Sequence, residues 1–219
     1  MRALVIGSSG GIGAAIAEEL QQRGTRVTSL SRRNEGLDVT DETSVAAVLA
    51  GLEAPFDLIF VATGALVVGD NGPEKSLRAL SAEGLEGQFA INALGPALVL
   101  KHAVRLMPRN RRAVFAVLSA RVGSIGDNLA GGWYSYRAAK AALNQIVHGA
   151  AIEVARTHPH AVLALLHPGT VDTAFTAEYP AHDKLTPEVA ARRLLNVLDG
   201  LGPEHSGQFY DHAGVPVPW

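Results

Sequence analysis

Short apolar segments alternate with longer amphipathic segments along most of the chain. The apolar segments are rich in β-branched residues and stay apolar through their central parts, which is typical of strands covered on both faces. They predict strands at Ala3–Ile6, Arg26–Leu30, Phe56–Ala62, Ala113–Leu118, Ala161–Leu166 and Gln208–Tyr210. Apolar positions at helical spacing predict helices at Ile12–Gln22, Glu42–Leu52, Ala82–Met107, Trp133–Thr157 and Pro187–Leu198. This alternation indicates an α/β fold in which helices flank both faces of a doubly wound parallel sheet.

The composition neither divides the chain nor points to a macromolecular partner. No linker rich in Pro, Gly or Ser interrupts the 219 residues, so we expect one domain over residues 1–219, with a turn at Asp70-Asn71-Gly72-Pro73. The net charge is −2 and both signs are interspersed, which gives no indication of a nucleic-acid partner or a membrane-surface segment. The apolar segments are too short to cross a bilayer and the first strand leaves no room for a signal peptide, so we expect a cytoplasmic protein.

Two residue types limit the chemistry that the chain can perform. There is no cysteine, which excludes disulfides and thiolate chemistry. The eight histidines show no spacing typical of metal ligands. We therefore expect no metal site.

The first predicted strand and helix are joined by Gly7-Ser8-Ser9-Gly10-Gly11-Ile12-Gly13, which holds four glycines in seven residues. A strand that turns abruptly into a helix needs positive φ angles, which glycine tolerates. A backbone without side chains also lets a pyrophosphate approach, and the free N–H groups at the helix start point towards it. A merely tight turn is the alternative, but the place of the loop after the first strand favours a dinucleotide site.

The spacing G-x-x-x-G-x-G, formed by Gly7, Gly11 and Gly13, resembles that of the short-chain dehydrogenase/reductase family. The resemblance implies a Rossmann-type fold that binds NAD(H) or NADP(H), with Ser9 and Ile12 also at the cofactor. Asp38 and Val39 resemble the segment of the family that contacts the adenine. Gly64 matches the last residue of the family's N-N-A-G segment, whose side-chain amides are missing from Val61-Ala62-Thr63.

Charge after the second predicted strand distinguishes the two cofactors. The chain reads Ser31-Arg32-Arg33 where an NAD-binding enzyme places an acid for the ribose hydroxyls. A guanidinium there pairs instead with a 2′-phosphate. We therefore predict NADP(H) rather than NAD(H), with Ser31 and Arg32 at the phosphate; the alternative is that Arg32 and Arg33 are solvated surface residues.

Tyr136 and Lys140 stand four residues apart in a predicted helix, so their side chains project from one face. Tyr134 is six residues from Lys140 and lies on another face. A neighbouring cation favours the phenolate and lowers a tyrosine pKa that is ordinarily about 10. Together with the glycine turn, the pair resembles the catalytic Tyr and Lys of the family, in which Tyr transfers the proton and Lys also holds the nicotinamide ribose.

The family adds a serine that hydrogen-bonds the substrate oxygen, and here this chain departs from the pattern. Counting back from Gly123 along the family's S-x-x-G places Ala120 at the serine position, with Ser119 one residue earlier. Successive residues of a strand face opposite ways, but a bulge at the strand end re-aims a side chain. We predict Ser119 for this role and keep Ser124 as the second candidate.

Two further segments resemble the family. Asn92 begins Asn92-Ala93-Leu94-Gly95, like the N-x-x-G whose Asn holds a water linked to the lysine; the alternative is an Asn satisfied within a helix bent by Pro96. The segment 168–173 resembles the P-G-x-V-x-T that packs on the nicotinamide, which places Pro168, Gly169, Val171 and Thr173 at the cofactor. Residues 171–185 are expected to cover the substrate pocket.

The resemblance covers nearly the whole chain and is closest to C-factor-like carbonyl reductases, through residues 119–126, 131–137 and 211–219. It implies an oxidoreductase that moves a hydride between NADP(H) and a carbonyl or alcohol carbon of a small molecule. Family members usually pair through the two long helices, so a homodimer or homotetramer is expected. The alternative is an NADP(H)-binding sensor or signalling protein with little catalysis.

Overall fold

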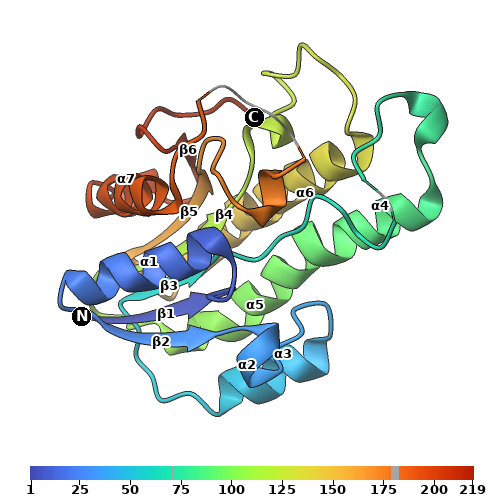
Figure 1. Ribbon diagram of the computed structural model, residues 1–219. Helices are drawn as coiled ribbons and strands as arrows, with labels where there is room; N and C mark the ends of the chain where they lie inside the picture. The colour runs from blue at the N-terminus through green and yellow to red at the C-terminus, as the bar shows by residue number, and fades with distance from the viewer. Residues whose placement is uncertain (71, 179–182) are drawn as a thin grey trace.

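All six predicted strands form and join one parallel sheet in the computed structural model, which describes residues 1–70, 72–178 and 183–219 (Figure 1). The strands are β1 (Arg2–Ile6), β2 (Arg26–Leu30), β3 (Leu58–Val61), β4 (Ala113–Leu118), β5 (Ala161–His167) and β6 (Phe209–Asp211). Their order across the sheet is β2-β1-β3-β4-β5-β6, and every neighbouring pair is parallel. The doubly wound α/β fold predicted from the sequence is therefore confirmed.

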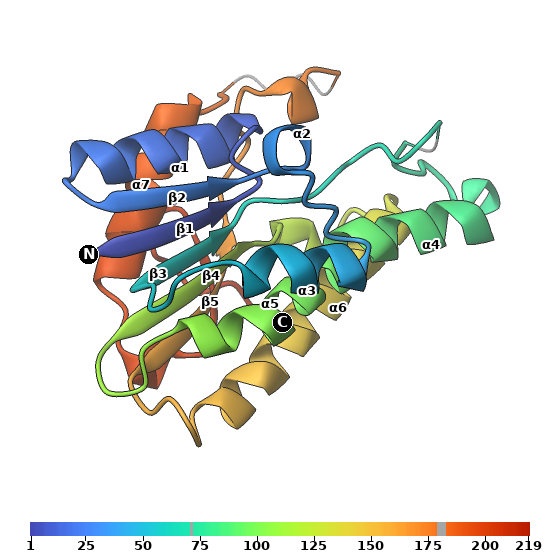
Figure 2. The ribbon, with the colours of Figure 1, turned by 90° about the horizontal axis from the view of Figure 1, so that it is seen from below.

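Helices cover both faces of this sheet. Helices α1 (Gly11–Gln22) and α7 (Pro187–Asp199) lie side by side on one face, as Figure 1 shows. Helices α3 (Glu42–Ala50), α5 (Gly95–Ala103) and α6 (Tyr134–Val154) lie on the other, seen in Figure 2. Alternate residues of each strand pack into the two apolar clusters that result, which explains why the strands are apolar throughout.

The long helix predicted at Ala82–Met107 is interrupted. Helix α4 (Ala82–Phe89) runs into a π-helical turn, Ala90–Leu94, before α5 begins, and a 3₁₀ turn follows α5. The N–H of Gly95 bonds to the carbonyl of Ala90, five residues back. Pro96 has no N–H to continue a regular helical ladder, which explains the change of register.

A short helix, α2 (Arg32–Glu35), was not predicted. The Ser31 hydroxyl accepts a hydrogen bond from the Asn34 amide at its start, and Gly36 ends it in the left-handed conformation, with φ +70°. Four residues are too few to show helical periodicity.

Two sequence predictions fall partly outside the described residues. These are the turn at Asp70–Pro73, which includes Asn71, and the pocket cover at 171–185, which includes 179–182.

Within the described residues, no helix is long and apolar enough to cross a membrane. No group of three or more His, Cys, Asp or Glu lies close enough there to hold a metal ion.

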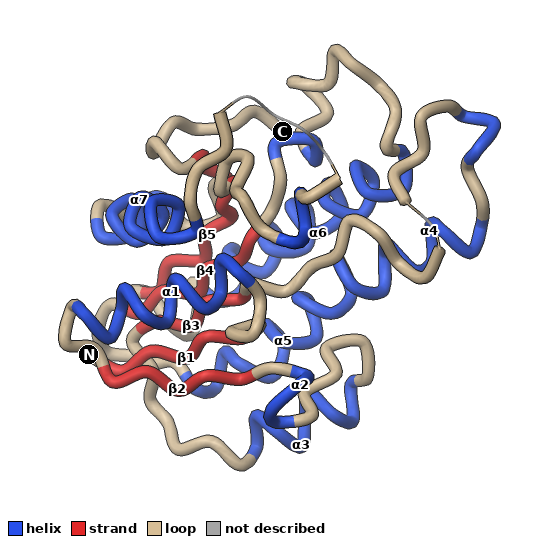
Figure 3. The backbone as a smooth tube through the Cα atoms, viewed as in Figure 1, coloured by secondary structure: helices blue, strands red, loops and turns tan. Residues whose placement is uncertain are grey.

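The strand order locates the ligand site. The chain leaves β1 towards β2 on one side and returns to β3 on the other, so the connections on the two sides of this point run in opposite directions. Ligands of open parallel sheets bind outside the carboxyl ends of the strands at such a switch point. The glycine turn after β1 and Gly64 after β3 both lie there, at the ends where the loops of Figure 3 gather.

Candidate active site

The glycine turn between β1 and α1 is built so tightly that side chains do not fit. Gly7 has φ +88°, and a Cβ there would lie 2.9 Å from the backbone carbon of Ala62. A Cβ on Gly13 would lie 2.8 Å from the Gly7 carbonyl carbon, and one on Gly11 would lie 2.6 Å from Thr173 Cγ2. The N-cap of α1 is Gly10, which offers no side chain to the amides of the first turn. These amides, with Ser9 and Ile12 beside them, form a cradle that fits a dinucleotide pyrophosphate.

The neighbouring strand β2 brings the predicted phosphate residues close to this turn. The amide of Gly7 donates to the carbonyl of Leu30, the last residue of β2, at 2.8 Å. Ser31 follows and is buried; its amide and hydroxyl donate to the Glu35 carboxylate at 2.6 and 3.0 Å. Arg32 is exposed. The structure therefore exposes Arg32 to solvent just after the carboxyl end of β2, and it uses the serine to hold α2.

The Asp38–Val39 segment lies beside α5. Hydrogen bonds from the hydroxyl and amide of Thr40, assisted by the positive charge of Arg32, hold the pKa of Asp38 below its usual value. The side chain of Val39 is buried, and a Cβ on Gly95 would lie 2.9 Å from its Cγ2. Asp38 therefore stays ionised, whereas Val39 packs into the core and leaves only its backbone for a ligand.

Tyr136 and Lys140 lie together on α6, as their spacing predicts. The Tyr136 side chain is 5% exposed and that of Lys140 is 3% exposed. The ammonium of Lys140 lies 5.8 Å from the centroid of the Tyr136 ring and donates to the carbonyl of Leu118, at the end of β4, at 2.9 Å. The helix thus places a phenol and an amine at the carboxyl edge of the sheet.

Asn92 is held in the same place by the π-helical turn. Its amide nitrogen donates to the Ala65 carbonyl at 2.8 Å and to the Gln88 side chain at 2.7 Å, while its oxygen accepts from the Ala65 amide. A Cβ on Gly64 would lie 3.0 Å from the Asn92 oxygen and 3.6 Å from the Lys140 ammonium. Gly64, Asn92 and Lys140 therefore converge, and only a glycine leaves room between them.

Burial sets the protonation of both groups on α6. Loss of solvent raises the pKa of Tyr136 well above its usual value, and it lowers the pKa of Lys140 to about 7. The sequence-based expectation that the lysine lowers the pKa of Tyr136 is therefore wrong for the protein alone. The physical reason is that desolvation disfavours the phenolate and the ammonium alike. At neutral pH Tyr136 is a neutral phenol, able to donate a proton.

The structure brings neither candidate serine into a hydrogen bond with Tyr136. Ser119 is 4% exposed, and its hydroxyl donates to the Asn144 side chain at 2.6 Å, one helical turn beyond Lys140. Ser124 is also buried, and its hydroxyl accepts from the Asp127 amide at 3.0 Å. Both hydroxyls are therefore engaged in holding the segment between β4 and α6.

The segment after β5 reaches back over the start of α1. Thr173 contacts the Gly11 position, as described above, and Val171 is buried in a bridge to Leu185. Gly169 has φ +80°, and a Cβ there would lie 2.6 Å from the His212 ring. Pro168 and Gly169 thus form the turn that carries Thr173 towards the cradle.

The family described as enoyl-(acyl carrier protein) reductase matches residues 6–199. A 1-hydroxy-2-glutathionyl-2-methyl-3-butene dehydrogenase of Rhodococcus sp. (strain AD45) is 33% identical, covering 99% of this chain and 98% of the relative. The chain belongs to the short-chain dehydrogenase/reductase family.

Two further proteins are similar to this short-chain dehydrogenase/reductase. The C-signal of Myxococcus xanthus is 40% identical over 60% of this chain and 76% of the relative. A crystal structure of a short-chain dehydrogenase/reductase from Burkholderia multivorans with bound NADP is 26% identical and superposes with a TM-score of 0.81, covering 100% of this chain and 99% of the other. The family membership makes the chain an oxidoreductase acting on CH–OH or C=O groups.

Sequence reasoning missed Phe175, Asn144 and Glu74 at this oxidoreductase site. Phe175, in the segment after β5, lies with its ring centroid 6.2 Å from that of Tyr136, and Trp133 flanks the same ring at 6.3 Å. Asn144 holds Ser119, and Glu74 contacts the start of α6. The spacing of Phe175, Asn144 and Glu74 along the chain carries no signal, because their contacts with Tyr136, Ser119 and Ser135 join distant segments.

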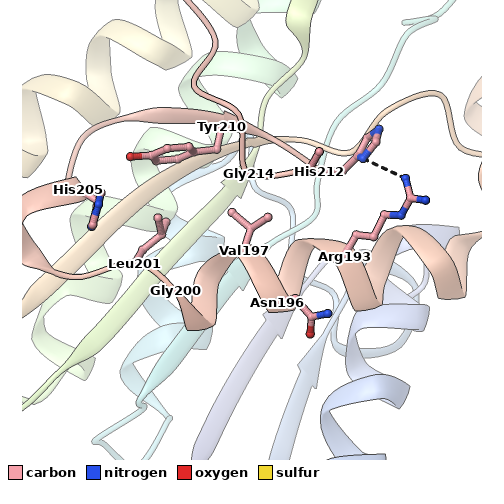
Figure 4. Close-up of a pocket in the computed structure, with 10 residues that line it drawn as sticks. Arg193, Asn196, Val197, Gly200, Leu201, His205, Tyr210, His212 and Gly214 are labelled. Atoms are coloured by element: carbon pink, nitrogen blue, oxygen red, sulfur yellow. Dashed lines mark hydrogen bonds between the residues drawn. The ribbon is translucent and has the colours of Figure 1, made fainter.

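An open pocket of about 560 Å³ lies elsewhere in the molecule, between α7 and the segment that follows β6 (Figure 4). Arg193 and His212 point towards each other across one end of it, with 3.3 Å between their nitrogens. None of the residues that line it belongs to the convergence around Gly64.

Proposed function

We propose that the chain is an NADP(H)-dependent carbonyl reductase in which Tyr136 donates the proton to the substrate oxygen. The observation that carries the proposal is the convergence of Tyr136, Lys140 and Asn92 beside Gly64 at the carboxyl edge of the sheet. A buried phenol with a raised pKa is a proton donor at neutral pH, which suits reduction of a carbonyl.

The residues of the switch point fit the proposed cofactor. The uncapped start of α1 and the contacts of Gly7, Gly11 and Gly13 leave a cradle for the pyrophosphate. Arg32 would pair with the 2′-phosphate, and Thr173 with the segment from Pro168 would lie by the nicotinamide. The bound NADP of the Burkholderia multivorans relative supports this assignment.

Bound NADPH would supply a hydride, and with it two electrons, to the carbonyl carbon. Tyr136 donates its proton to the oxygen as the C=O double bond becomes a C–O single bond, which yields the alcohol. Lys140, with a pKa of about 7, exchanges protons readily at neutral pH and is the group through which Tyr136 recovers its proton. Asn92 lies beside Gly64 as well and is the next group of this path.

Ser119 is the proposed second contact of the substrate oxygen. Its hydroxyl would have to leave Asn144 to donate to the substrate. Breaking one such bond costs about 1 kcal/mol net, which limits what Ser119 contributes.

The proposed protein is cytoplasmic and works as a homodimer or homotetramer on a small carbonyl or alcohol, without nucleic acid or membrane. Exposed apolar side chains on the two long helical segments, Leu94, Ile146 and Ile152, support pairing through these helices. Sedimentation of the purified chain tests the assembly.

A carbonyl screen that follows NADPH consumption tests the catalytic proposal. Wild type should oxidise NADPH with at least one aldehyde or ketone, and Tyr136→Phe should lower kcat by about 10²- to 10⁴-fold while NADPH binding remains. Full activity of Tyr136→Phe would refute the role of the phenol.

A second candidate function is NADP(H) binding for signalling with little turnover. The match to the C-signal favours it, as does Ala120 at the family's serine position. It predicts tight NADPH binding with no NADPH oxidation across the whole carbonyl panel.

A further inference from the structure

The start of the catalytic helix α6 lacks a cap of its own. Its N-cap residue is Trp133, in the left-handed conformation with φ +53°, and this side chain makes no cap hydrogen bond. Helix N-caps are ordinarily Ser, Thr, Asp or Asn, whose oxygens accept from the amides of the first turn. The first turn of α6 contains Tyr136, so the way in which its amides are satisfied bears on the reacting group.

Glu74, in the segment between β3 and α4, supplies the missing acceptor. One oxygen of its carboxylate accepts from the Ser135 amide at 3.2 Å, and the other accepts from the Ser135 hydroxyl. The backbone carbonyl of Glu74 accepts from the Trp133 amide at 2.6 Å. A single residue, 61 positions from Ser135 along the chain, therefore holds the backbone of both Trp133 and Ser135 at the start of α6.

The burial and charge of Glu74 indicate a specific contact rather than a surface one. Its side chain is 9% exposed, and a buried carboxylate is retained only where hydrogen bonds and favourable charge offset its lost hydration. The positive end of the α6 dipole provides that charge. Lys75, the next residue, is exposed, so burial is confined to the side chain that reaches the helix.

We propose that Glu74 is a positioning residue of the active site, which fixes the first turn of α6 and thereby the direction of the Tyr136 hydroxyl. Tyr136 follows Ser135 directly, so any rotation or fraying of this turn moves the phenol. A displacement of about 1 Å from the reacting oxygen is enough to lower a rate 10²-fold. The inference rests on the proposed function for its catalytic part, but not for the helix contact.

Four variants test the proposal in the full chain. Glu74→Ala removes both carboxylate contacts, and Ser135→Ala removes the hydroxyl contact while keeping the amide. Glu74→Gln preserves both, since its carbonyl accepts from the Ser135 amide and its NH₂ donates to the Ser135 hydroxyl. Glu86→Ala is the matched control, an exposed glutamate of α4.

Glu74→Ala should lower kcat about 30-fold and leave the Michaelis constant for NADPH within about twofold. The primary isotope effect with deuterated NADPH should rise, because hydride and proton transfer become slower than the other steps. Glu74→Gln should stay within about threefold of wild type, and Glu86→Ala should not differ from it. In the protein without cofactor, hydrogen exchange of the amides at 134–137 should become about tenfold faster in Glu74→Ala.

Wild-type kcat in a folded Glu74→Ala protein would overturn the proposal, as would equal loss in Glu74→Ala and Glu74→Gln. If Glu74→Ala does not fold, Ser135→Ala decides: unchanged kcat together with unchanged exchange at 134–137 would overturn it. If wild type turns over no carbonyl, the proposed function fails instead. The exchange measurement then still decides whether Glu74 holds the start of α6.

Discussion

The glycine turn after β1 and the start of α6 face the same switch point but are specified in different ways. In the turn, three glycines are required because backbone and neighbouring side chains occupy the space where a Cβ would stand. At α6, the reacting phenol depends on contacts from segments far away in the chain, Glu74 after β3 and the residues around Leu118. Glycines at positions where a side chain does not fit are visible in the sequence by their own spacing, whereas the acceptors that hold the start of α6 lie in distant segments that spacing does not identify.

The largest effect on cofactor binding is expected from a side chain placed in the turn. Gly13→Ala places a methyl group 2.8 Å from the Gly7 carbonyl carbon, so the backbone of the turn has to open. NADPH should then bind roughly 100-fold more weakly, equivalent to about 2.7 kcal/mol, in a fluorescence titration. Gly149→Ala is the matched control, because it lies in α6 with open space around it and should bind NADPH normally. Binding within threefold of wild type for Gly13→Ala would contradict the steric argument.

The second prediction concerns Lys140, whose amine is buried on α6. Burial lowers the pKa of Lys140 from 10.5 to about 7, so between these values the unfolded chain binds more protons than the folded one. The contribution of Lys140 to the free energy of unfolding therefore rises with pH across that interval, by about 2 kcal/mol between pH 7 and pH 9. Urea unfolding of the protein without cofactor measures it.

The comparison with Lys140→Met isolates this contribution, because other groups that titrate in the same interval affect both proteins. Wild type should gain stability relative to Lys140→Met as the pH rises. If the difference between the two is flat from pH 7 to pH 9, the ammonium is better solvated than its 3% exposure indicates.

The same contrast explains what the sequence could and could not predict. The strands lie at the predicted ranges because their apolar runs are the direct consequence of burial on two faces. The convergence of Lys140, Asn92 and Gly64 agrees with the family motifs on three separate elements. The predicted direction of the Tyr136 pKa shift was wrong because the shift depends on burial, which spacing does not report.

Other features depend on tertiary contacts that no local pattern records. The π-helical turn at Ala90–Leu94 breaks one predicted helix into two, yet only Pro96 marks it in the sequence. The partner of Ser119 is 25 residues away and that of Ser135 is 61 residues away. A hydroxyl can be located from the sequence, but the direction of its proton is decided by the acceptor that folding brings to it.

The third prediction concerns Arg32 and the preference for NADPH over NADH. Arg32 is exposed and follows the carboxyl end of β2, so its removal should weaken NADPH binding about tenfold without changing NADH binding, and the loss should shrink at high salt. Arg26→Ala is the control, since Arg26 is also exposed but lies at the amino end of β2, away from the switch point. Equal loss for NADPH and NADH would show that Arg32 is a solvated surface residue.

The smallest effect is expected at Ser119. A donor already aimed at the reacting oxygen is worth about 10²- to 10³-fold in kcat, but the Ser119 proton is directed to Asn144, and freeing it costs about 1 kcal/mol. Ser119→Ala should therefore lower kcat only about threefold, with Ser124→Ala assayed beside it. A loss of 100-fold in Ser119→Ala would show that Asn144 releases the hydroxyl to the substrate. A larger loss in Ser124→Ala would move the role to that residue, so this pair of variants decides whether a serine or the positioned phenol alone carries the substrate oxygen.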